Sequence, residues 1–329
     1  MTGKINSCPI CRSSLRLDTL VAPELDVYAG KLYRYGHCSA CDVLVLQNPP
    51  SDKNAADIDY SESGYYNNKK VKFSSLVALV SKLYTAHRVR TAKKFIADNT
   101  FSGKKVLDIG CGKGRFLEQI KYVGGDIRGV EPTRRSFESA RESLGNVIEH
   151  SIMSNGLFEI ESFDMVTLWH VFEHLPDPIS MLNACHEVLK PDGILIVAVP
   201  NFSGAFAKSA TWFNLDPPRH LIHFNEKSLP RLLKDNGFSV VGVNYYYPEL
   251  AYLGTLQSML NQLPITPNFL FNLLKRNLIG LPSSKLIYGK DIVITCVAGF
   301  MLSPFVILAV HLLSMMHRSD CVTVIAKKT

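Results

Sequence analysis

The sequence lacks three features that would assign it to other classes of protein. Its first twelve residues contain no apolar stretch, so we expect no secretory signal peptide and a chain that begins in the cytoplasm. Its basic residues exceed its acidic residues by seven (36 − 29) but form no long run, so nucleic acid is not expected as a partner. It also contains no internal repeat. Because 47% of its residues are apolar, intrinsic disorder is excluded and a folded protein is expected.

The chain of 329 residues divides into segments that differ in pattern. Between residues 105 and 247, short β-branched runs alternate with helical stretches, which predicts parallel βαβ units and an open, doubly wound α/β sheet. The expected strands span 106–109, 127–130, 147–150, 163–170, 194–199 and 239–246. The expected organisation is a zinc ribbon at 1–50, a helical connector at 51–101, an α/β core at 102–247, an apolar helical insertion at 248–319 and a last strand at 320–329.

Four of the eight cysteines form two Cys-x-x-Cys pairs near the amino terminus. Thiols in the cytoplasm usually stay reduced, and paired motifs of this kind hold metal more often than they form disulfides. The two pairs can supply the four thiolates of a tetrahedral structural zinc site, from Cys8, Cys11, Cys38 and Cys41. Four protein ligands leave no position for a reacting water, so we expect zinc to fold this segment rather than to catalyse.

A glycine-rich loop follows the first expected strand of the core. The stretch VLDIGCGKG (106–114) places Asp108 before a G-x-G-x-G turn, where glycine lets the backbone approach a ligand closely. The nicotinamide fingerprint differs, because its third glycine comes one position later. Glu131 ends the next strand, where a carboxylate can accept hydrogen bonds from both hydroxyls of a ribose. The alternative is a tight strand-to-helix turn with an incidental acid.

With these motifs, residues 105–247 resemble the class I S-adenosylmethionine-dependent methyltransferases. The likeness also covers FDMV (163–166) and LKPDG (189–193). It implies a seven-stranded, Rossmann-like sheet with S-adenosylmethionine as the cofactor. It further implies that Asp108 and the loop backbone face the methionine part of the cofactor, while Glu131 holds the ribose. The implied loop positions are Gly110, Gly112 and Gly114.

The same resemblance implies two further cofactor contacts. Many relatives have an acid after the third strand that receives the adenine amino group, and this chain has Ser151 there, in EHSI (149–152). His170 follows the fourth strand, at the carboxyl edge where ligands bind in such sheets. We therefore expect Ser151 near the adenine and His170 among the cofactor-binding residues.

The stretch WHVFEHL (169–175) resembles the E-H-L segment of the ubiquinone O-methyltransferase-like group. Methyl transfer is an in-line displacement at a sulfonium, so the enzyme mainly aligns the acceptor and removes its proton. A histidine can remove a proton near neutral pH, which makes His174 a candidate base. Glu173 would orient His174 or contribute to a metal site. The alternative is that both residues cap or hold the next helix.

A second cluster, DPPRHLIHF (216–224), follows the fifth strand at the same edge. Loops in this position commonly cover the acceptor, so His220 is the other candidate base and Arg219 a candidate anion contact. We expect His223 to pack, or to cap the helix that begins near Asn225. The sequence does not rank His174 against His220.

An uncharged apolar stretch, 292–310, precedes the end of the chain. As a helix it would be roughly 28 Å long, about the thickness of the hydrocarbon layer of a membrane. CVTVIAKK (321–328) reads as a strand, and the resemblance implies that it joins the sheet antiparallel to the sixth strand. Both ends of the insertion must then lie on one side of a membrane.

We therefore expect a membrane-dipping helical hairpin that reverses near Gly299, Ser303 and Pro304. Basic residues around it can meet anionic head groups: Lys275, Arg276, Lys285, Lys290 and Arg318. The alternatives are a soluble helical lid or a dimer interface.

The sequence thus predicts a zinc-ribbon, class I methyltransferase that moves a methyl group to oxygen or carbon of a small or lipid-linked acceptor. A polyprenyl-linked sugar or a quinone-like ring would suit the apolar insertion. The expected location is the cytoplasm, on the inner face of the membrane. Two alternatives stay open. One is an RNA base methyltransferase with a zinc module, against which the dispersed basic residues count. The other is a membrane-associated, S-adenosylmethionine-binding protein without catalysis.

Overall fold

The computed structural model describes residues 4–23, 32–50, 74–275 and 284–329. The chain divides into two compact units. We call residues 75–199, 227–244 and 323–329 the sheet unit, and residues 1–74, 200–226 and 245–322 the ribbon unit. Residues 200–226, which the sequence places in the core, are therefore grouped with the amino-terminal segment and the insertion. Part of the expected connector, 51–73, lies outside the described residues.

A seven-stranded sheet forms the centre of the sheet unit, in the order β10-β11-β8-β7-β4-β5-β6. Its strands are β4 (Lys105–Ile109), β5 (Asp126–Val130), β6 (Ile148–Glu149), β7 (Phe163–Trp169), β8 (Leu189–Pro200), β10 (Phe238–Asn244) and β11 (Cys321–Lys328). The pairs from β8 to β6 are parallel, whereas β11 pairs antiparallel with β10. The doubly wound α/β sheet and its antiparallel last strand are confirmed.

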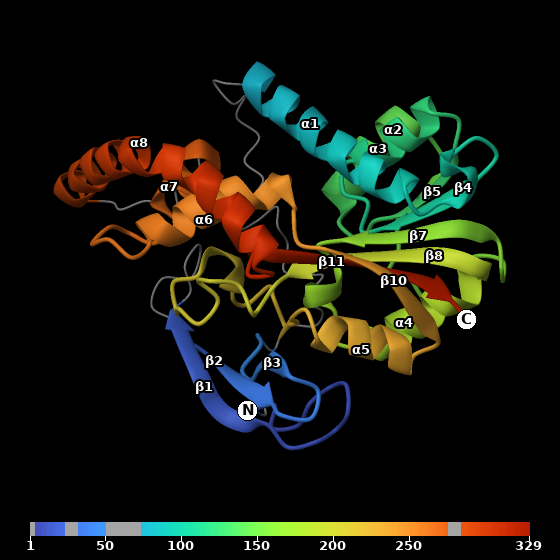
Figure 1. Cartoon of the computed structure of the whole chain (residues 1–329), viewed down its shortest axis with the longest axis horizontal. Helices are drawn as coiled ribbons and strands as arrows, with labels where there is room; N and C mark the ends of the chain where they lie inside the picture. The colour runs from blue at the N-terminus through green and yellow to red at the C-terminus, as the bar shows by residue number, and fades with distance from the viewer. Residues whose placement is uncertain (1–3, 24–31, 51–73, 276–283) are drawn as a thin grey trace. The chain divides into compact units, whose positions relative to one another are not determined.

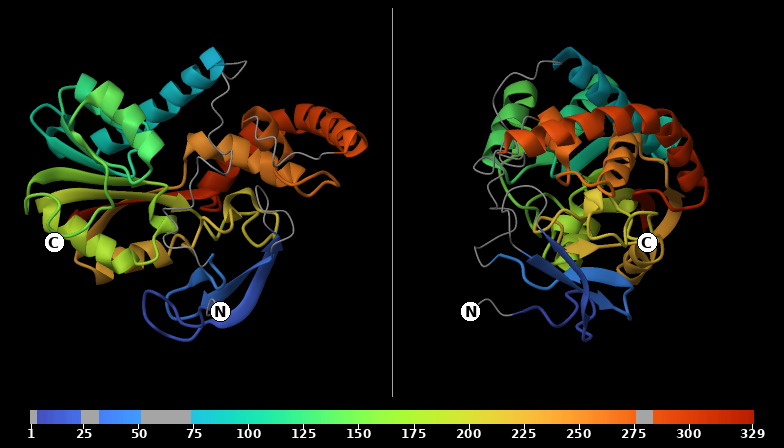
Figure 2. Two further views of the ribbon diagram at one scale, coloured as in Figure 1. Left: turned by 180° about the vertical axis from the view of Figure 1, so that it is seen from behind. Right: turned by 90° about the vertical axis from the view of Figure 1, so that its left-hand side faces the viewer.

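Helices cover both faces of this sheet (Figure 1; Figure 2). On one face lie α1 (Ser74–Lys93), α2 (Arg115–Tyr122) and α3 (Arg134–Leu144), and on the other lie α4 (Pro178–Val188) and α5 (Ser228–Asp235). The sequence explains these elements locally. Helix α2 buries the apolar face made by Phe116, Leu117 and Ile120. Helix α4 begins with Pro178, and Asp177 caps it by accepting a hydrogen bond from Ser180 N.

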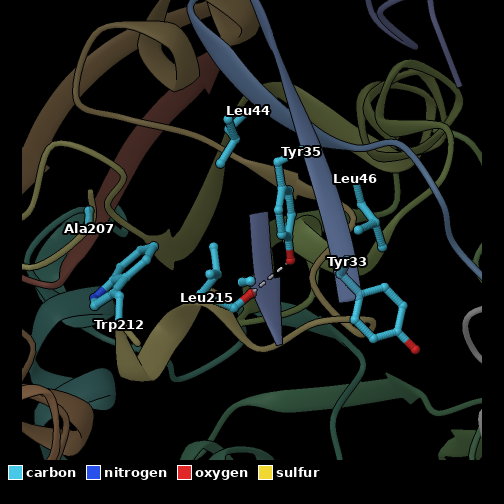
Figure 3. Packing of buried hydrophobic residues seen from close by; sticks show 8 residues of the cluster. Tyr33, Tyr35, Leu44, Leu46, Ala207, Trp212 and Leu215 are labelled. Carbon is cyan, nitrogen blue, oxygen red and sulfur yellow. Dashed lines mark hydrogen bonds between the residues drawn. The ribbon is translucent and has the colours of Figure 1, made fainter. Parts of the chain in front are cut away.

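A four-stranded antiparallel sheet lies in the ribbon unit, in the order β1-β2-β3-β9. Its strands are β1 (Arg16–Pro23), β2 (Leu32–Cys38), β3 (Val43–Leu46) and β9 (Ile222–His223). A cluster of buried side chains joins it to residues 207–215, through Trp212 and Leu215 (Figure 3). The Tyr35 hydroxyl donates to Leu215 O at 3.3 Å. The segment after the fifth expected strand therefore completes the ribbon.

The insertion forms α6 (Pro248–Leu260), α7 (Phe269–Lys275) and α8 (Lys285–Met315). The expected reversal near Gly299, Ser303 and Pro304 is wrong, because α8 is one continuous helix with Pro304 inside it. A proline bends a helix without having to end it, and here both halves of α8 pack on α6, α7 and the segment between them. The Ser303 hydroxyl also donates to Gly299 O within the helix.

Candidate functional site

The glycine loop joins β4 to α2. Gly110, Gly112 and Gly114 have φ values of 68°, 56° and 76°, a left-handed conformation that other residues rarely adopt. A Cβ atom at Gly110 would lie 2.4 Å from Val171 Cγ2, and one at Gly114 would lie 2.7 Å from Leu144 Cδ1, so close packing also requires glycine there. A Cβ atom at Gly112 would have no described atom within 4 Å. Of the three, Gly112 is the position where a ligand has room beside the backbone.

Glu131 follows β5, and its carboxylate accepts a hydrogen bond from this loop. Its Oε2 accepts a hydrogen bond from Gly112 N, and its Oε1 accepts one from Thr133 N, both at 2.8 Å. The side chain is buried. A carboxylate oxygen can accept a second hydrogen bond, which is the capacity that two ribose hydroxyls need. Glu131 therefore fixes the loop at Gly112 and keeps the capacity to accept further hydrogen bonds.

Asp108 is buried near the end of β4. Thr167 Oγ1 donates to its Oδ1 at 2.6 Å. Burial raises the pKa of Asp108 to about 7, while the Thr167 hydrogen bond and the positive charge of Arg88 lower it. The Arg88 guanidinium also lies over the Trp169 ring, 5.3 Å from the ring centre. A cationic group of a ligand beside Asp108 would favour its ionised form, so this carboxyl is suited to an ammonium group.

Arg88 and Thr167 are parts of the site that the sequence analysis did not find. Arg88 belongs to α1, in the segment assigned to the connector, and its only signal is a basic residue on a helix. Thr167 reads as an ordinary β-branched residue of a strand. Its role depends on the parallel register that sets it opposite Asp108 across β4 and β7. That register cannot be read from a single sequence.

The structure brings His170 and Glu173 together after β7. His170 N donates to Ala198 O on β8 at 2.9 Å, and its Nδ1 donates to Glu173 Oε1 at 3.2 Å. Glu173 is almost fully buried and shares the short turn η3 (Phe172–His174) with His174. These residues lie at the carboxyl edge of the sheet, where the sequence analysis placed them.

Ser151 lies two residues beyond the end of β6. Its hydroxyl donates to Ile152 O at 3.0 Å. The neighbouring His150 stacks on Phe137, with ring centres 4.7 Å apart, and its Nε2 lies 3.0 Å from Pro132 O. The aromatic surface of this segment is therefore the stacked pair of His150 and Phe137, whereas the Ser151 hydroxyl bonds within its own segment.

His220 belongs to the ribbon unit. Its Nδ1 donates to Asn214 O at 2.7 Å, which makes Nε2 the basic nitrogen of the neutral ring. Asp216 Oδ2 lies 3.6 Å from that Nε2. Asp216 also accepts hydrogen bonds from Nε and Nη2 of Arg219, so the anion that Arg219 contacts here is the carboxylate of its neighbour. His223 packs between the rings of Tyr35 and Trp212, in agreement with its expected packing role.

The two Cys-x-x-Cys turns of the ribbon unit share one backbone geometry. Arg12 N donates to Cys8 O at 2.9 Å, and Asp42 N donates to Cys38 O at 2.8 Å. The φ values of Arg12 and Asp42 are 63° and 56°. All four sulfur atoms lie within 4.8 Å of one another, and those of Cys11 and Cys38 are 3.6 Å apart. Sulfurs around one zinc ion at ~2.3 Å lie roughly 3.8 Å apart, so the arrangement fits that ion.

Similarity to known protein sequences lies in the middle of the chain. Residues 82–243 match the model of a methyltransferase-domain family. The ubiquinone biosynthesis O-methyltransferase of Actinobacillus pleuropneumoniae serotype 5b (strain L20) is 34% identical over 113 residues, which cover 31% of this chain and 48% of that protein. The protein of the same name from Neisseria meningitidis serogroup A / serotype 4A (strain DSM 15465 / Z2491) is 39% identical over 107 residues, covering 30% and 45%. The chain spans about half the length of the curated relatives it matches.

A solved structure extends the likeness in fold. Geranyl diphosphate methyltransferase in complex with S-adenosylmethionine superposes with a TM-score of 0.50 and 12% identity, covering 77% of this chain and 89% of that one. At this identity the likeness shows the fold alone. The family match contains Asp108, the glycine loop, Glu131 and η3, whereas residues 1–81 and 244–329 lie outside it.

Proposed function

Because residues 82–243 form a class I S-adenosylmethionine-dependent methyltransferase domain, we propose that the chain transfers a methyl group from S-adenosylmethionine to an oxygen of a quinone-like acceptor. The assignment of the methyl donor rests on the glycine loop, which is open at Gly112, hydrogen-bonded to Glu131 and flanked by the buried Asp108. The acceptor is supported by the names of the curated relatives, which are ubiquinone biosynthesis O-methyltransferases.

In this proposal the chain supplies binding and alignment. S-adenosylmethionine, when bound, provides an electrophilic methyl group on a positively charged sulfur. Asp108 binds the ammonium of the cofactor and Glu131 its ribose hydroxyls, while the Gly112 backbone allows close approach. Arg88 is near enough to Asp108 to lower its pKa, and its positive charge suits the carboxylate of the cofactor. Ser151 and His170 remain the candidate contacts for the adenine and for the rest of the cofactor.

Two histidines are the candidate bases for the acceptor proton. His220 has its Nδ1 committed to Asn214 O, so a proton taken from the acceptor would go to Nε2, where Asp216 would stabilise the resulting charge. His174 belongs to the sheet unit and follows the buried Glu173 in the turn η3. Either histidine would act with the methyl donor held in line with the acceptor oxygen.

Calorimetric titration with S-adenosylmethionine, followed by a turnover assay with methyl-labelled cofactor, tests this function. The variants Asp108→Asn and Glu131→Gln should lose cofactor affinity, whereas His174→Gln and His220→Gln should keep it. Loss of turnover in one histidine variant alone would identify the base. Wild-type affinity in both carboxylate variants would contradict the assigned donor site. Cofactor binding without turnover against any cell extract would favour the non-catalytic alternative.

A lipid-linked acceptor, such as a polyprenyl-linked sugar, is a second candidate, with transfer to oxygen or carbon. It is favoured by α8, which by length and composition can cross a membrane and has only 17% of its most apolar window buried. A chain that meets such an acceptor would work at the cytoplasmic face of a membrane. The RNA alternative predicts instead that label from the cofactor enters the nucleic-acid fraction of the extract.

We also propose that the four cysteines of the ribbon unit hold a structural zinc ion. The matched turns and the sulfur separations support this proposal. Metal analysis of the purified protein should find about one zinc per chain. The variant Cys38→Ser should lose the metal, whereas Cys296→Ser, which changes an exposed cysteine of α8, should keep it. Protein that folds normally and contains no zinc would overturn the proposal.

A further inference from the structure

The insertion is a hairpin of helices, with α6 and α7 as one arm and α8 as the other. Near its base, Val306 and Val310 of α8 pack with Ala251 of α6. Farther out, Tyr288 and Ile292 of α8 pack in a second cluster, around Leu260, Ile265 and Phe269. Helices α6 and α8 therefore run antiparallel, because the start of α6 packs near the end of α8 and the end of α6 packs near the start of α8. Figure 1 shows α6 and α8 side by side.

The two ends of the hairpin are tied together. Ser314 Oγ, at the end of α8, donates to Tyr245 O at 3.2 Å. The Tyr245 ring stacks on His317, with ring centres 4.1 Å apart and planes at 13°. Because residues 245 and 317 meet, the chain enters and leaves the insertion at one place. Any surface that the insertion binds must therefore be reached from one side.

The face of α8 that packs against the other arm is partly polar. Asp291 is fully buried, and its Oδ2 accepts hydrogen bonds from Thr266 N at 3.1 Å and Thr266 Oγ1 at 2.6 Å. Thr295, one turn later, is also buried. Within the other arm, between α6 and α7, Asn261 Nδ2 donates to Asn268 Oδ1 at 3.0 Å. These contacts fix the register of the arms and keep α8 attached to its own unit.

The outer face of α8 is apolar and exposed. Phe300 is 84% exposed and Phe305 is 65% exposed. The exposed apolar residues recur every three or four positions, which places them along one side of the helix over roughly 33 Å. Between residues 293 and 315 they are Val293, Val297, Phe300, Met301, Phe305, Ile307, Leu308, Leu312 and Met315. A helix at a water-facing surface normally shows the reverse pattern, with its apolar side inward. A continuous exposed apolar face of this size marks a binding surface.

The charges around this face indicate what it binds. Its exposed charged groups are all basic, with Lys285 and Lys290 at one end and Arg318 just beyond the other, while the acid of α8, Asp291, is buried. A helical hairpin that turns one apolar face outward and carries basic residues at both ends of that face suits the boundary between the head groups and acyl chains of an anionic bilayer. We propose that the outer face of α8 lies in the plane of an anionic membrane, entered from one side and not crossed.

This proposal deepens the proposed function, and rests on it only for the acceptor that the membrane would present. Binding of the protein to vesicles of phosphatidylcholine, with and without phosphatidylglycerol, tests it by flotation. The double variant Phe300→Glu and Phe305→Glu should reduce partition into anionic vesicles by about tenfold or more. The matched control is Ile160→Glu, which changes a 69% exposed apolar residue of the sheet unit and should leave partition unchanged.

Two readouts separate the possible failures. Cofactor binding of each variant, measured without vesicles, reports the methyltransferase domain, and the circular dichroism spectrum reports the helices. Reduced partition with unchanged cofactor binding and helix content supports the proposal. A wild-type protein that ignores anionic vesicles, or a double variant that binds them as well as wild type, overturns it. A dimer that dissociates in the double variant, without vesicle binding in either protein, would show instead that a second copy covers this face.

Depth measurements distinguish a helix α8 that lies in the plane of the membrane from one that crosses the bilayer. Both native tryptophans are buried, so single tryptophans introduced as Val293→Trp, Met301→Trp and Leu312→Trp can be compared in vesicles with lipids brominated at different depths. A helix in the plane of the interface places all three at a similar, shallow depth. A helix that crosses the bilayer places residue 301 deepest and the other two near opposite surfaces, which would contradict the proposal.

Discussion

The two units of this molecule differ in where their buried polar groups and their exposed apolar side chains lie. In the sheet unit the centre is apolar, and the three buried carboxylates, Asp108, Glu131 and Glu173, all lie at the carboxyl ends of strands. The ribbon unit has an apolar cluster too, but it also holds four neighbouring thiols, of which only Cys8 and Cys38 are buried, and a polar network around Asp291. Its longest helix turns an apolar face outward.

This difference teaches which buried polar groups serve a ligand and which serve the fold. Asp108 and Glu131 lie beside a loop with left-handed glycines and open space at Gly112, where the proposed cofactor would offset their desolvation. Asp291 has a structural role instead, because its two hydrogen bonds from Thr266 join α8 to the segment between α6 and α7.

Removal of the proposed zinc ion should damage the ribbon unit and spare the sheet unit. A structural zinc site contributes on the order of 10 kcal/mol to folding in small modules. We expect a strong chelator to abolish the near-ultraviolet signal of the ribbon aromatic residues, which include Tyr35 and Trp212. Calorimetry should still detect S-adenosylmethionine binding, because Asp108 and Glu131 belong to the other unit. Equal sensitivity of both signals would remove this contrast between the units.

Glu131→Ala should weaken S-adenosylmethionine binding about 100-fold, or about 3 kcal/mol. The substitution removes the expected ribose acceptor and also frees Gly112 N and Thr133 N, which the carboxylate now holds. Titration calorimetry measures the change. Glu138→Ala is the control, because this side chain is exposed on α3. A similar loss in the control would mean that charge alone, rather than position, sets the affinity.

Asp291→Ala should lower the free energy of unfolding by about 1–2 kcal/mol, because Thr266 loses the acceptor of two hydrogen bonds. Denaturant titration measures this value, and cofactor affinity should not change. Lys285→Ala, at an exposed position of the same helix, should stay within about 0.5 kcal/mol of wild type. A loss of cofactor affinity in Asp291→Ala would contradict its purely structural role.

Thr167→Val should shift the pH dependence of cofactor binding. The pKa of Asp108 is raised by burial to about 7, so its ionised form, and the ammonium binding it supports, should be lost as pH falls through 7. Without the Thr167 hydrogen bond the pKa of Asp108 rises further, so the pH midpoint of cofactor binding moves to higher pH. The lost hydrogen bond contributes about 1 kcal/mol, which sets the size of this shift. Titrations between pH 6 and 9 measure the midpoint, and an unmoved midpoint would exclude Thr167 as a positioning residue.

The same pKa shift fixes a stability trend. Because the folded pKa of Asp108 lies above its ordinary value of 3.8, the folded chain holds a proton that the unfolded chain has released between about pH 4 and 7. The contribution of this group to stability therefore falls as pH rises through that window. Asp108→Asn should remove this part of the pH dependence in denaturant titrations while weakening cofactor binding.

Much of the sheet unit could be predicted because its signals are local. Helix α2 (115–122) has such a local signal, since the glycine loop precedes it and its apolar residues recur at helical spacing. The last strand, 321–328, was also found, because a β-branched run follows a long apolar segment. The roles of Arg88 and Thr167 depend on which elements pack or pair together, and a single sequence does not contain that information.

The ribbon unit was harder to predict for the same reason. The pairing of β9 with β3 joins residues 222–223 to 44–45, a distance along the chain that no local pattern encodes. The predicted break in α8 relied on Pro304, but packing of both helix halves against the other arm keeps the helix continuous. Hydropathy identified the apolar helix, whereas only the structure revealed which face is outward.

The most direct test of the account is to follow the methyl group. Purified protein is incubated with methyl-labelled S-adenosylmethionine and an extract of the source cells, and the label is divided among organic, nucleic-acid and water-soluble fractions. Glu131→Ala serves as the inactive control. The account predicts label in the organic fraction, carried by a quinone-like or lipid-linked acceptor, with wild type only. Label confined to RNA or to water-soluble metabolites, or equal labelling by the control, would contradict it.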